Sequence, residues 1–234
     1  MASQETGLEH GGNLGLLSGM AGCRPVEIMD FSANINCFPA PGWLPAVYQR
    51  AFAEINHYPE PRAESLRSAL STHWRRPVEN ILAANGSGEI FFALARLKRA
   101  RRILTCMPCY AGYAHAAGAS GRPHVNLRTR QDDFSIDFAV LRETLCPGDM
   151  LILGHPNNPD GRLLPLGMLS GLVLDRPEVT WVVDESFIDF CGAHQSFKNL
   201  RLPNLVVVHS FTKFFAIPGL RFGAVLASAE IIAE

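Results

Sequence analysis

One lysine, Lys213, stands at a position where an amine could act as a nucleophile. The preceding run "LVVV" at 205–208 is aliphatic without alternation, which is typical of a strand buried on both faces. A lysine at the end of such a strand loses part of its hydration, which lowers its pKa and makes its amine available to attack a carbonyl. The alternative is that Lys213 is an ordinary solvated lysine after a strand.

A second strand end could bind phosphate. The apolar run "ILAA" is followed by "NGSGE" at 85–89 and then by a helical pattern. The amides of Ser87, Gly88 and Glu89 are therefore expected at a helix N-terminus, which attracts anions, and the glycines let a phosphate approach. A plain N-cap by Ser87 is the alternative interpretation.

Two further strand ends carry polar side chains that suit either a ligand or local structure. In "HPNNPDG" at 155–161, Asn158 could bind a ligand oxygen or carboxylate, although each residue type in this stretch also suits a tight turn. Asp184 closes the apolar run at 180–183. It is either a helix-capping residue or a buried counter-charge for a ligand cation.

Together these positions supply what pyridoxal 5'-phosphate requires. Lys213 would hold the cofactor as a Schiff base, and Asp184 would keep the pyridine nitrogen protonated so that the ring serves as an electron sink. Arg221 and Ser210, with the amides of residues 87–89, would hold the phosphate. The second asparagine of the turn would bond the phenolic oxygen. The order of these motifs along the chain, more than any one of them, predicts the cofactor site.

A parallel sheet would bring these side chains together. Short apolar runs typical of strands occur at 81–84, 102–106, 124–127, 150–154, 180–184, 205–210 and 222–227. Amphipathic stretches such as "ESLRSALSTHW", "GEIFFALARLK" and "DFAVLRETL" lie between most of them. The alternation predicts an α/β fold, a mainly parallel sheet with helices on both faces, in which ligands gather at the carboxyl ends of the strands.

Composition favours a globular protein with a small ligand. The chain has 234 residues, 47% hydrophobic and 18% charged, and its 21 basic and 22 acidic residues give a net charge of -1. This balance gives no sign of affinity for nucleic acid or an acidic membrane. The sequence shows neither a signal peptide nor a membrane-spanning run, so we expect a cytoplasmic protein. Neither the "CMPC" pair nor the histidines have convincing metal-ligand spacing, so no metal is expected.

The motifs, in their order, resemble those of the fold-type I, class I/II aminotransferase superfamily of pyridoxal-phosphate enzymes. The resemblance rests on "NGSGE", "HPNNPDG", "VVDESFIDF" and "SFTKFFAIPGLRFG", and covers essentially the whole chain. Within the superfamily, "EHGGN", "DFSANIN", "YPEP" and "DESFIDF" look most like the L-threonine-O-3-phosphate decarboxylases of cobalamin biosynthesis. The histidinol-phosphate aminotransferases are the sister branch. Residues 1–40 are rich in Gly, Asn and Pro, which predicts an N-terminal arm or irregular lead-in, and the resemblance implies a cofactor-binding large domain at 41–234.

The resemblance also implies roles for residues that the strand ends do not reveal. Tyr110 is expected to stack on the cofactor ring. Tyr58 is expected to reach the cofactor phosphate of a neighbouring subunit, which implies a homodimer. A small phosphorylated amino acid is the implied substrate. The residues expected to contact it are His10, Gly11, Asn34 and Asn158.

The implied reaction is decarboxylation of L-threonine O-3-phosphate to (R)-1-amino-2-propanol O-2-phosphate, and the alternative is transamination of histidinol phosphate or a similar substrate. Phe187 stands where many aminotransferases have tyrosine, which fits the decarboxylase branch. The family's carboxy-terminal small domain, which supplies an arginine for the substrate carboxylate, is not expected within this chain. A protein that ended at Glu234 would then have weak or no turnover and could be a non-catalytic cofactor-binding remnant.

Overall fold

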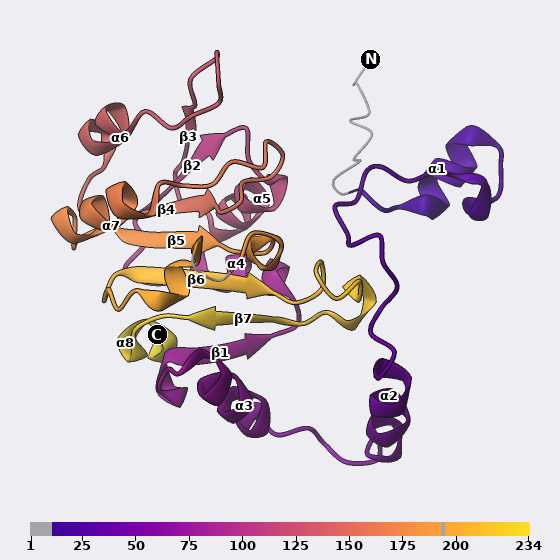
Figure 1. The fold of residues 1–234 in the computed structure, drawn as a ribbon. Helices are drawn as coiled ribbons and strands as arrows, with labels where there is room; N and C mark the ends of the chain where they lie inside the picture. Colours follow the sequence, from indigo (N-terminus) through magenta and orange to yellow (C-terminus); the bar gives the residue numbers. More distant parts are fainter. Residues whose placement is uncertain (1–10, 193–194) are drawn as a thin grey trace.

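A single mixed sheet organises the chain, which a computed structural model describes for residues 11–192 and 195–234 (Figure 1). Its strand order is β1-β7-β6-β5-β4-β2-β3. β7 runs antiparallel to both of its neighbours, and the other adjacent pairs are parallel. The strands are β1 (Ile81–Ala84), β2 (Arg102–Met107), β3 (His124–Arg128), β4 (Asp149–Gly154), β5 (Thr180–Asp184), β6 (Leu205–Ser210) and β7 (Gly223–Leu226). All seven apolar runs therefore form strands, and the predicted mainly parallel α/β sheet is confirmed.

Helices connect most of the strands. The α-helices are α1 (Leu14–Ala21), α2 (Leu44–Ala53), α3 (Glu64–Trp74), α4 (Ser87–Leu94), α5 (Ala111–Ser120), α6 (Phe138–Thr144), α7 (Leu166–Asp175) and α8 (Ala229–Ala233). The short 3-10 helices are η1 (Pro25–Glu27), η2 (Val78–Asn80), η3 (Ile188–Phe190), η5 (Phe197–Asn199) and η6 (Pro218–Leu220). No helix within the described part of the chain is long and apolar enough to cross a membrane.

The two faces of the sheet bury separate hydrophobic clusters, so helices cover both faces as predicted. Met150 and Ile152 of β4 belong to the cluster that includes side chains of α4, α5 and α8. Leu151 and Leu153, which point the other way, belong to the cluster with side chains of α3, α6 and α7. Burial on both faces explains why the central strands read as continuous apolar runs.

The same alternation decides which strand-end side chains meet. Val182 of β5 and Val208 of β6 pack in the α4–α5 cluster. Asp184 and Ser210 each lie two residues further along these strands, so both side chains point to the same face. His209 points to the opposite face. The ends of β5 and β6 therefore present Asp184 and Ser210 together beneath α4 and α5.

The segment before α3 lies outside this core. None of residues 11–69 is buried, and α1 and α2 stand apart from the sheet in Figure 1. The irregular lead-in predicted for residues 1–40 contains a short helix, α1, which begins after Asn13, whose side chain accepts a hydrogen bond from the Leu16 amide. Exposure continues through α2, beyond the expected end of the arm.

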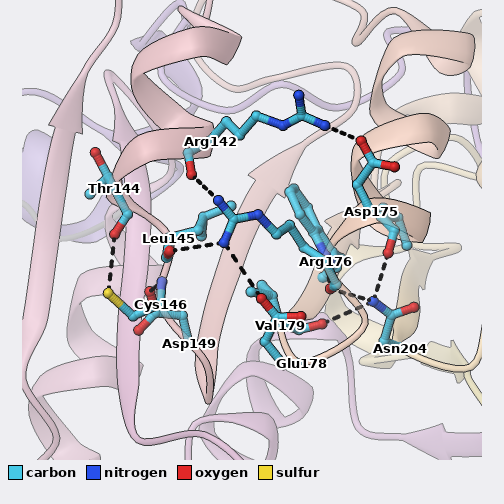
Figure 2. A network of polar contacts seen from close by, with 12 residues as sticks. Arg142, Thr144, Leu145, Cys146, Asp149, Asp175, Arg176, Glu178, Val179 and Asn204 are labelled. Atoms are coloured by element: carbon cyan, nitrogen blue, oxygen red, sulfur yellow. Dashed lines mark hydrogen bonds and ion pairs between the residues drawn. The ribbon is translucent and has the colours of Figure 1, made fainter.

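Away from the site, Asn204 fastens the end of α7 to the sheet (Figure 2). Its buried side-chain amide donates to the carbonyl oxygens of Val173, Arg176 and Val179 at 3.0–3.1 Å. The backbone carbonyl of Asn204 accepts from the Trp181 backbone amide at 2.8 Å. The two protons of the Asn204 side-chain amide thus serve three carbonyls where α7 ends, and the Arg176 carbonyl also accepts from the Val179 amide at 3.2 Å. By contrast, the nearby Arg142–Asp175 ion pair is solvent-exposed.

Asn204→Ala should lower the free energy of unfolding by about 2 to 3 kcal/mol, because buried carbonyls lose their donor. Arg142→Ala, which removes the exposed ion pair in the same region, should cost less than about 1 kcal/mol. Urea unfolding of both variants tests the difference. Equal losses in the two variants would contradict this account of the α7–β5 connection.

Candidate active site

A cavity of about 890 Å³ opens at the carboxyl ends of β5 and β6. Most of the residues predicted from sequence to bind cofactor or substrate line it. They are Gly11, Asn34, Ser87, Gly88, Tyr110, Asn158, Asp184, Ser210, Lys213 and Arg221. Segments as far apart in sequence as Gly11 and Arg221 therefore meet in one place.

Three predicted residues do not line this cavity within the described structure. Glu89 turns its carboxylate back on its own loop, where Oε2 accepts from the Asn85 amide at 2.6 Å. Tyr58 is fully exposed on the segment between α2 and α3. His10 lies outside the described residues.

The N-terminus of α4 faces the cavity without a side-chain cap. Its N-cap is Gly86, with φ of 89°, and no side chain bonds the first amides. The alternative interpretation of Ser87 as the N-cap is therefore wrong, because Ser87 is the first residue of the helix itself. Uncapped amides and the helix dipole make this end a site for an anion.

Close packing places a cation beside this helix end. A Cβ on Gly86 would stand 2.4 Å from Nη2 of Arg221, and a Cβ on Gly223 would stand 2.8 Å from the Gly86 carbonyl carbon. Glycine at both positions lets β7 and the Arg221 side chain approach the loop. A Cβ on Gly88, by contrast, would meet nothing within 4 Å. There is open space at the helix end, with a guanidinium next to the loop that precedes it.

Lys213 is not an ordinary solvated lysine. Its side chain is partly buried and lines the cavity. Burial lowers its pKa, the Arg221 charge lowers it further, and the Asp184 carboxylate acts in the opposite direction. A lysine with a lowered pKa has a larger fraction of neutral, nucleophilic amine near neutral pH.

Asp184 is a buried carboxylate that accepts three hydrogen bonds. Its Oδ1 accepts from the Ser186 amide at 3.0 Å and from the Ser186 hydroxyl at 2.6 Å. Its Oδ2 accepts from the Tyr113 hydroxyl at 2.7 Å. Burial raises the pKa of Asp184, while these hydrogen bonds and the Lys213 charge oppose the rise. Asp184 caps no helix, since η3 begins only at Ile188, so the counter-charge interpretation fits better.

Tyr113 was not among the predicted site residues, although it holds Asp184. It is fully buried, and its ring centroid lies 4.9 Å from that of Phe91 and 5.4 Å from that of Tyr110. The Tyr110 ring lies against Gly112, where an added Cβ would be 2.2 Å from ring carbon Cε1. The spacing of Tyr110 and Tyr113, one helical turn apart, is the sequence signal that could have revealed this pair.

The asparagine turn combines structure with a place in the cavity wall. The Asn157 side chain donates from Nδ2 to the Pro108 carbonyl at 3.0 Å. The Asn157 backbone carbonyl accepts from the Gly161 amide at 2.9 Å. Asn158, its neighbour, lines the cavity. The tight turn and the ligand-facing position are thus compatible interpretations of the same motif.

The aminotransferase class I and II family matches residues 26–234. The chain belongs to this family. A threonine-phosphate decarboxylase from Salmonella typhimurium is 36% identical over 232 residues, covering 94% of this chain and 62% of that protein. The chain spans between 26% and 62% of the length of the first curated relatives that it matches.

Solved structures give the same fold. An L-threonine-O-3-phosphate decarboxylase from Porphyromonas gingivalis has a TM-score of 0.73 and 30% identity, over 88% of this chain and 62% of that one. A histidinol-phosphate aminotransferase from Clostridium acetobutylicum has a TM-score of 0.80 and 27% identity with the same coverage. The predicted fold-type I pyridoxal-phosphate enzyme family is confirmed, and with it the family cofactor, pyridoxal 5'-phosphate.

The donor set of the cavity fits this cofactor. The uncapped α4 amides and the open space at Gly88 suit a phosphate, with Arg221 as the neighbouring cation. Ser210 and Thr212 add two buried hydroxyls 2.9 Å apart. Asp184 offers a buried carboxylate to a protonated ring nitrogen, and Lys213 offers the amine.

Directly behind Asp184, Glu185 occupies a separate polar network. It is fully buried, and it accepts from the Ser196 hydroxyl at 2.6 Å and the Phe197 amide at 2.5 Å. Burial raises its pKa from 4.5 to about 7. Between these pH values the folded protein holds a proton that the unfolded chain has released, so this contribution to stability is complete below about pH 4.5 and is lost as the pH rises through about 7.

Glu185→Gln should remove most of this pH dependence, which amounts to about 3 kcal/mol in the wild-type protein. Urea unfolding between about pH 4 and about pH 8 measures the slope, because this range includes both the unfolded and the folded pKa of Glu185. Glu54→Gln, the same change at an exposed position on the C-cap of α2, is the control and should keep the wild-type slope. A wild-type slope in Glu185→Gln would show that another group is responsible.

Tyr113→Phe should weaken pyridoxal-phosphate binding about tenfold, because Asp184 loses a charge-assisted hydrogen bond. Loss of this donor raises the Asp184 pKa further, so the loss of affinity should grow as the pH falls. Cofactor titrations followed by absorbance at several pH values measure this effect. Tyr48→Phe on the exposed face of α2 is the control, and identical affinities for the two variants at every pH would refute the role of Tyr113.

Proposed function

We propose that the protein is a pyridoxal-phosphate enzyme that decarboxylates L-threonine O-3-phosphate to (R)-1-amino-2-propanol O-2-phosphate for cobalamin biosynthesis. The observation that carries the proposal is the 36% identity to the Salmonella typhimurium threonine-phosphate decarboxylase across 94% of this chain. A bifunctional adenosylcobalamin biosynthesis protein from Leptospira interrogans is also 36% identical, over 95% of the chain. The histidinol-phosphate aminotransferases compared with it are 30% to 34% identical over less of the chain.

Each part of the cavity has a proposed task in holding the cofactor. The α4 amides, Arg221 and Ser210 hold its phosphate, and Tyr110 packs against its ring. Asp184 holds the proton on the ring nitrogen, and its three hydrogen bonds keep the carboxylate oriented toward that task. Pyridoxal phosphate supplies an electron sink for the pair released when a bond at the substrate Cα breaks.

Lys213 carries the proposed proton transfer. Decarboxylation breaks the bond between Cα and the carboxylate carbon, releases carbon dioxide and requires one proton at Cα in its place. The ammonium of Lys213 is placed in the cavity to give that proton, and its lowered pKa eases the transfer near neutral pH. The partly buried position of the lysine limits competing protonation by bulk water.

The arm provides the proposed substrate side of the cavity. Gly11 and Asn34 line the wall together with Ser32, next to the part proposed for the cofactor. Backbone amides and an asparagine at this wall are hydrogen-bond donors that suit a phosphorylated substrate. His10, which lies outside the described residues, belongs to the same proposal.

A homodimer is part of the proposal. Tyr58 is completely exposed, and the segment before α3 also exposes large apolar side chains such as Phe31, at 86%, and Phe52, at 71%. Apolar surface of this kind is unusual on a monomer and suits a subunit interface. Tyr58 would then reach the cofactor phosphate of the partner subunit.

Transamination is the second candidate, because the Clostridium acetobutylicum histidinol-phosphate aminotransferase has the higher of the two TM-scores, 0.80 against 0.73. The same lysine could then move a proton from Cα rather than to it. Phe187 in the cavity wall, where many aminotransferases have tyrosine, supports decarboxylation instead.

Borohydride reduction with pyridoxal phosphate should attach the cofactor to Lys213, and Lys213→Ala should lower carbon dioxide release from L-threonine O-3-phosphate by at least about 10³-fold. The sequence contains three lysines, Lys98, Lys198 and Lys213, so peptide mapping identifies the attachment site without ambiguity. Lys98→Ala at the protein surface is the control.

Three outcomes would change the proposal. An adduct at another lysine would refute the cofactor site. Amino transfer from histidinol phosphate without carbon dioxide release would favour the second candidate. An adduct at Lys213 without turnover of either substrate would favour the cofactor-binding remnant.

A further inference from the structure

Asn36 joins the arm to the segment that carries Lys213. Its backbone amide donates to the Lys213 carbonyl at 3.0 Å, and its side-chain Nδ2 donates to the Phe214 carbonyl at 2.8 Å. Its Oδ1 accepts from the Phe38 amide at 3.1 Å. Every polar group of the side chain is therefore engaged, and two consecutive carbonyls in the lysine segment depend on one arm residue.

The lysine segment has little regular structure of its own. After β6 ends at Ser210, the chain makes successive turns until η6 begins at Pro218. The Lys213 carbonyl receives a second, longer hydrogen bond from the Ala216 amide at 3.4 Å, and Ala216 itself has a φ of 54°. Amides of the turn itself also donate to the Phe211 and Thr212 carbonyls, and the Asn36 side chain extends this support to the Phe214 carbonyl.

On the other side of Asn36, the arm forms a compact piece of cavity wall. The Gly12 amide donates to Ser32 Oγ at 2.8 Å, and the Ser32 amide donates to Asp30 Oδ1 at 2.7 Å. Gly11 packs so closely that a Cβ would stand 1.7 Å from the Ser32 carbonyl oxygen. Ser32 and Asn34 line the cavity just before Asn36.

Asn36 also carries the hydrogen bonds between the described part of the arm and the segment after β6. Within residues 11–192 and 195–234, both hydrogen bonds that join residues 11–40 to the chain beyond residue 60 come from Asn36. A change of this side chain should therefore loosen the wall, and the one bond that it breaks inside the arm is the bond from the Phe38 amide.

We propose that Asn36 is a positioning residue that couples the placement of Lys213 to the placement of the substrate-side arm. The inference rests on the proposed function, since it assumes that pyridoxal phosphate attaches to Lys213. Attachment fixes the lysine segment, and through Asn36 it holds the arm against the cavity. Because coupling between two sites is reciprocal, an arm held in place also favours cofactor binding. The wall that meets the substrate is thus held more firmly around a loaded site.

Asn36→Ala tests this coupling, and Asn80→Ala is a matched control. Asn80 makes the same kind of long-range contact. Its side-chain Nδ2 donates to the Ala227 carbonyl at 2.6 Å, and its backbone carbonyl accepts from the Ala227 amide at 3.0 Å. That contact joins η2 to the end of β7 and does not line the cavity. Both variants lose one asparagine–carbonyl bond, but only one of those bonds involves the lysine segment.

Two readouts separate positioning from general destabilisation. Pyridoxal-phosphate affinity, measured by absorbance titration, should fall about five- to tenfold in Asn36→Ala and stay at the wild-type value in Asn80→Ala. Chymotrypsin cleavage after Phe31 of the arm, which is 86% exposed and is followed by Ser32, reports arm placement. Cofactor should slow this cleavage in the wild-type protein and in Asn80→Ala, but not in Asn36→Ala.

Hydrogen exchange of the wild-type protein provides a test that needs no variant. The Asn36 amide donates to the Lys213 carbonyl, so its exchange should slow at least about tenfold when cofactor attaches. Unchanged exchange, or an Asn36→Ala protein with wild-type affinity and wild-type cofactor protection, would overturn the coupling. Failure of the wild-type protein to form an adduct at Lys213 would instead refute the proposed function, and the coupling with it.

Discussion

The alternation of side chains on β5 and β6 is the constraint on which the cavity depends. Valines of both strands fill the core beneath α4 and α5, and the two-residue period then sends Asp184 and Ser210 toward the cavity. A slip of one residue would exchange Asp184 for Glu185 and Ser210 for His209. Each of these has hydrogen-bond partners on the other face, so the chemistry of both faces reinforces the register set by the valines.

This constraint explains why so much of the fold and site could be predicted. Strands buried on both faces are continuous apolar runs in the sequence, and polar residues at their carboxyl ends meet because the strands are parallel. Asp184 and Ser210 are positioned by this rule alone. Ser87 follows from a different rule, since a helix begins directly after β1, although its exact place in that helix needed the backbone geometry of Gly86.

Residues that act through another side chain were harder to predict. Tyr113 lies in an apolar helix, where its sequence context is that of a core aromatic, and only the fold shows its hydroxyl reaching Asp184. Asn36 lies in a stretch rich in small and polar residues whose partners are 177 and 178 positions away, a relation that local pattern cannot contain. Tyr58 depends on surface beyond a single chain, so its proposed role stays a prediction.

Lys213 differs from Asp184 in how its position is maintained. Asp184 belongs to a strand, and the hydrogen-bond ladders with β4 and β6 fix its backbone. Lys213 lies three residues beyond the end of β6, where no ladder reaches, and the shorter of the two hydrogen bonds to its carbonyl comes from Asn36 in the arm. A rigid carboxylate suits a task that never changes, which is to hold one proton. The Lys213 amine must attach to the cofactor, detach from it and transfer a proton, so it benefits from a segment whose path can respond to the arm. This explains why two hydrogen bonds from Asn36, rather than a strand, hold the lysine segment in place.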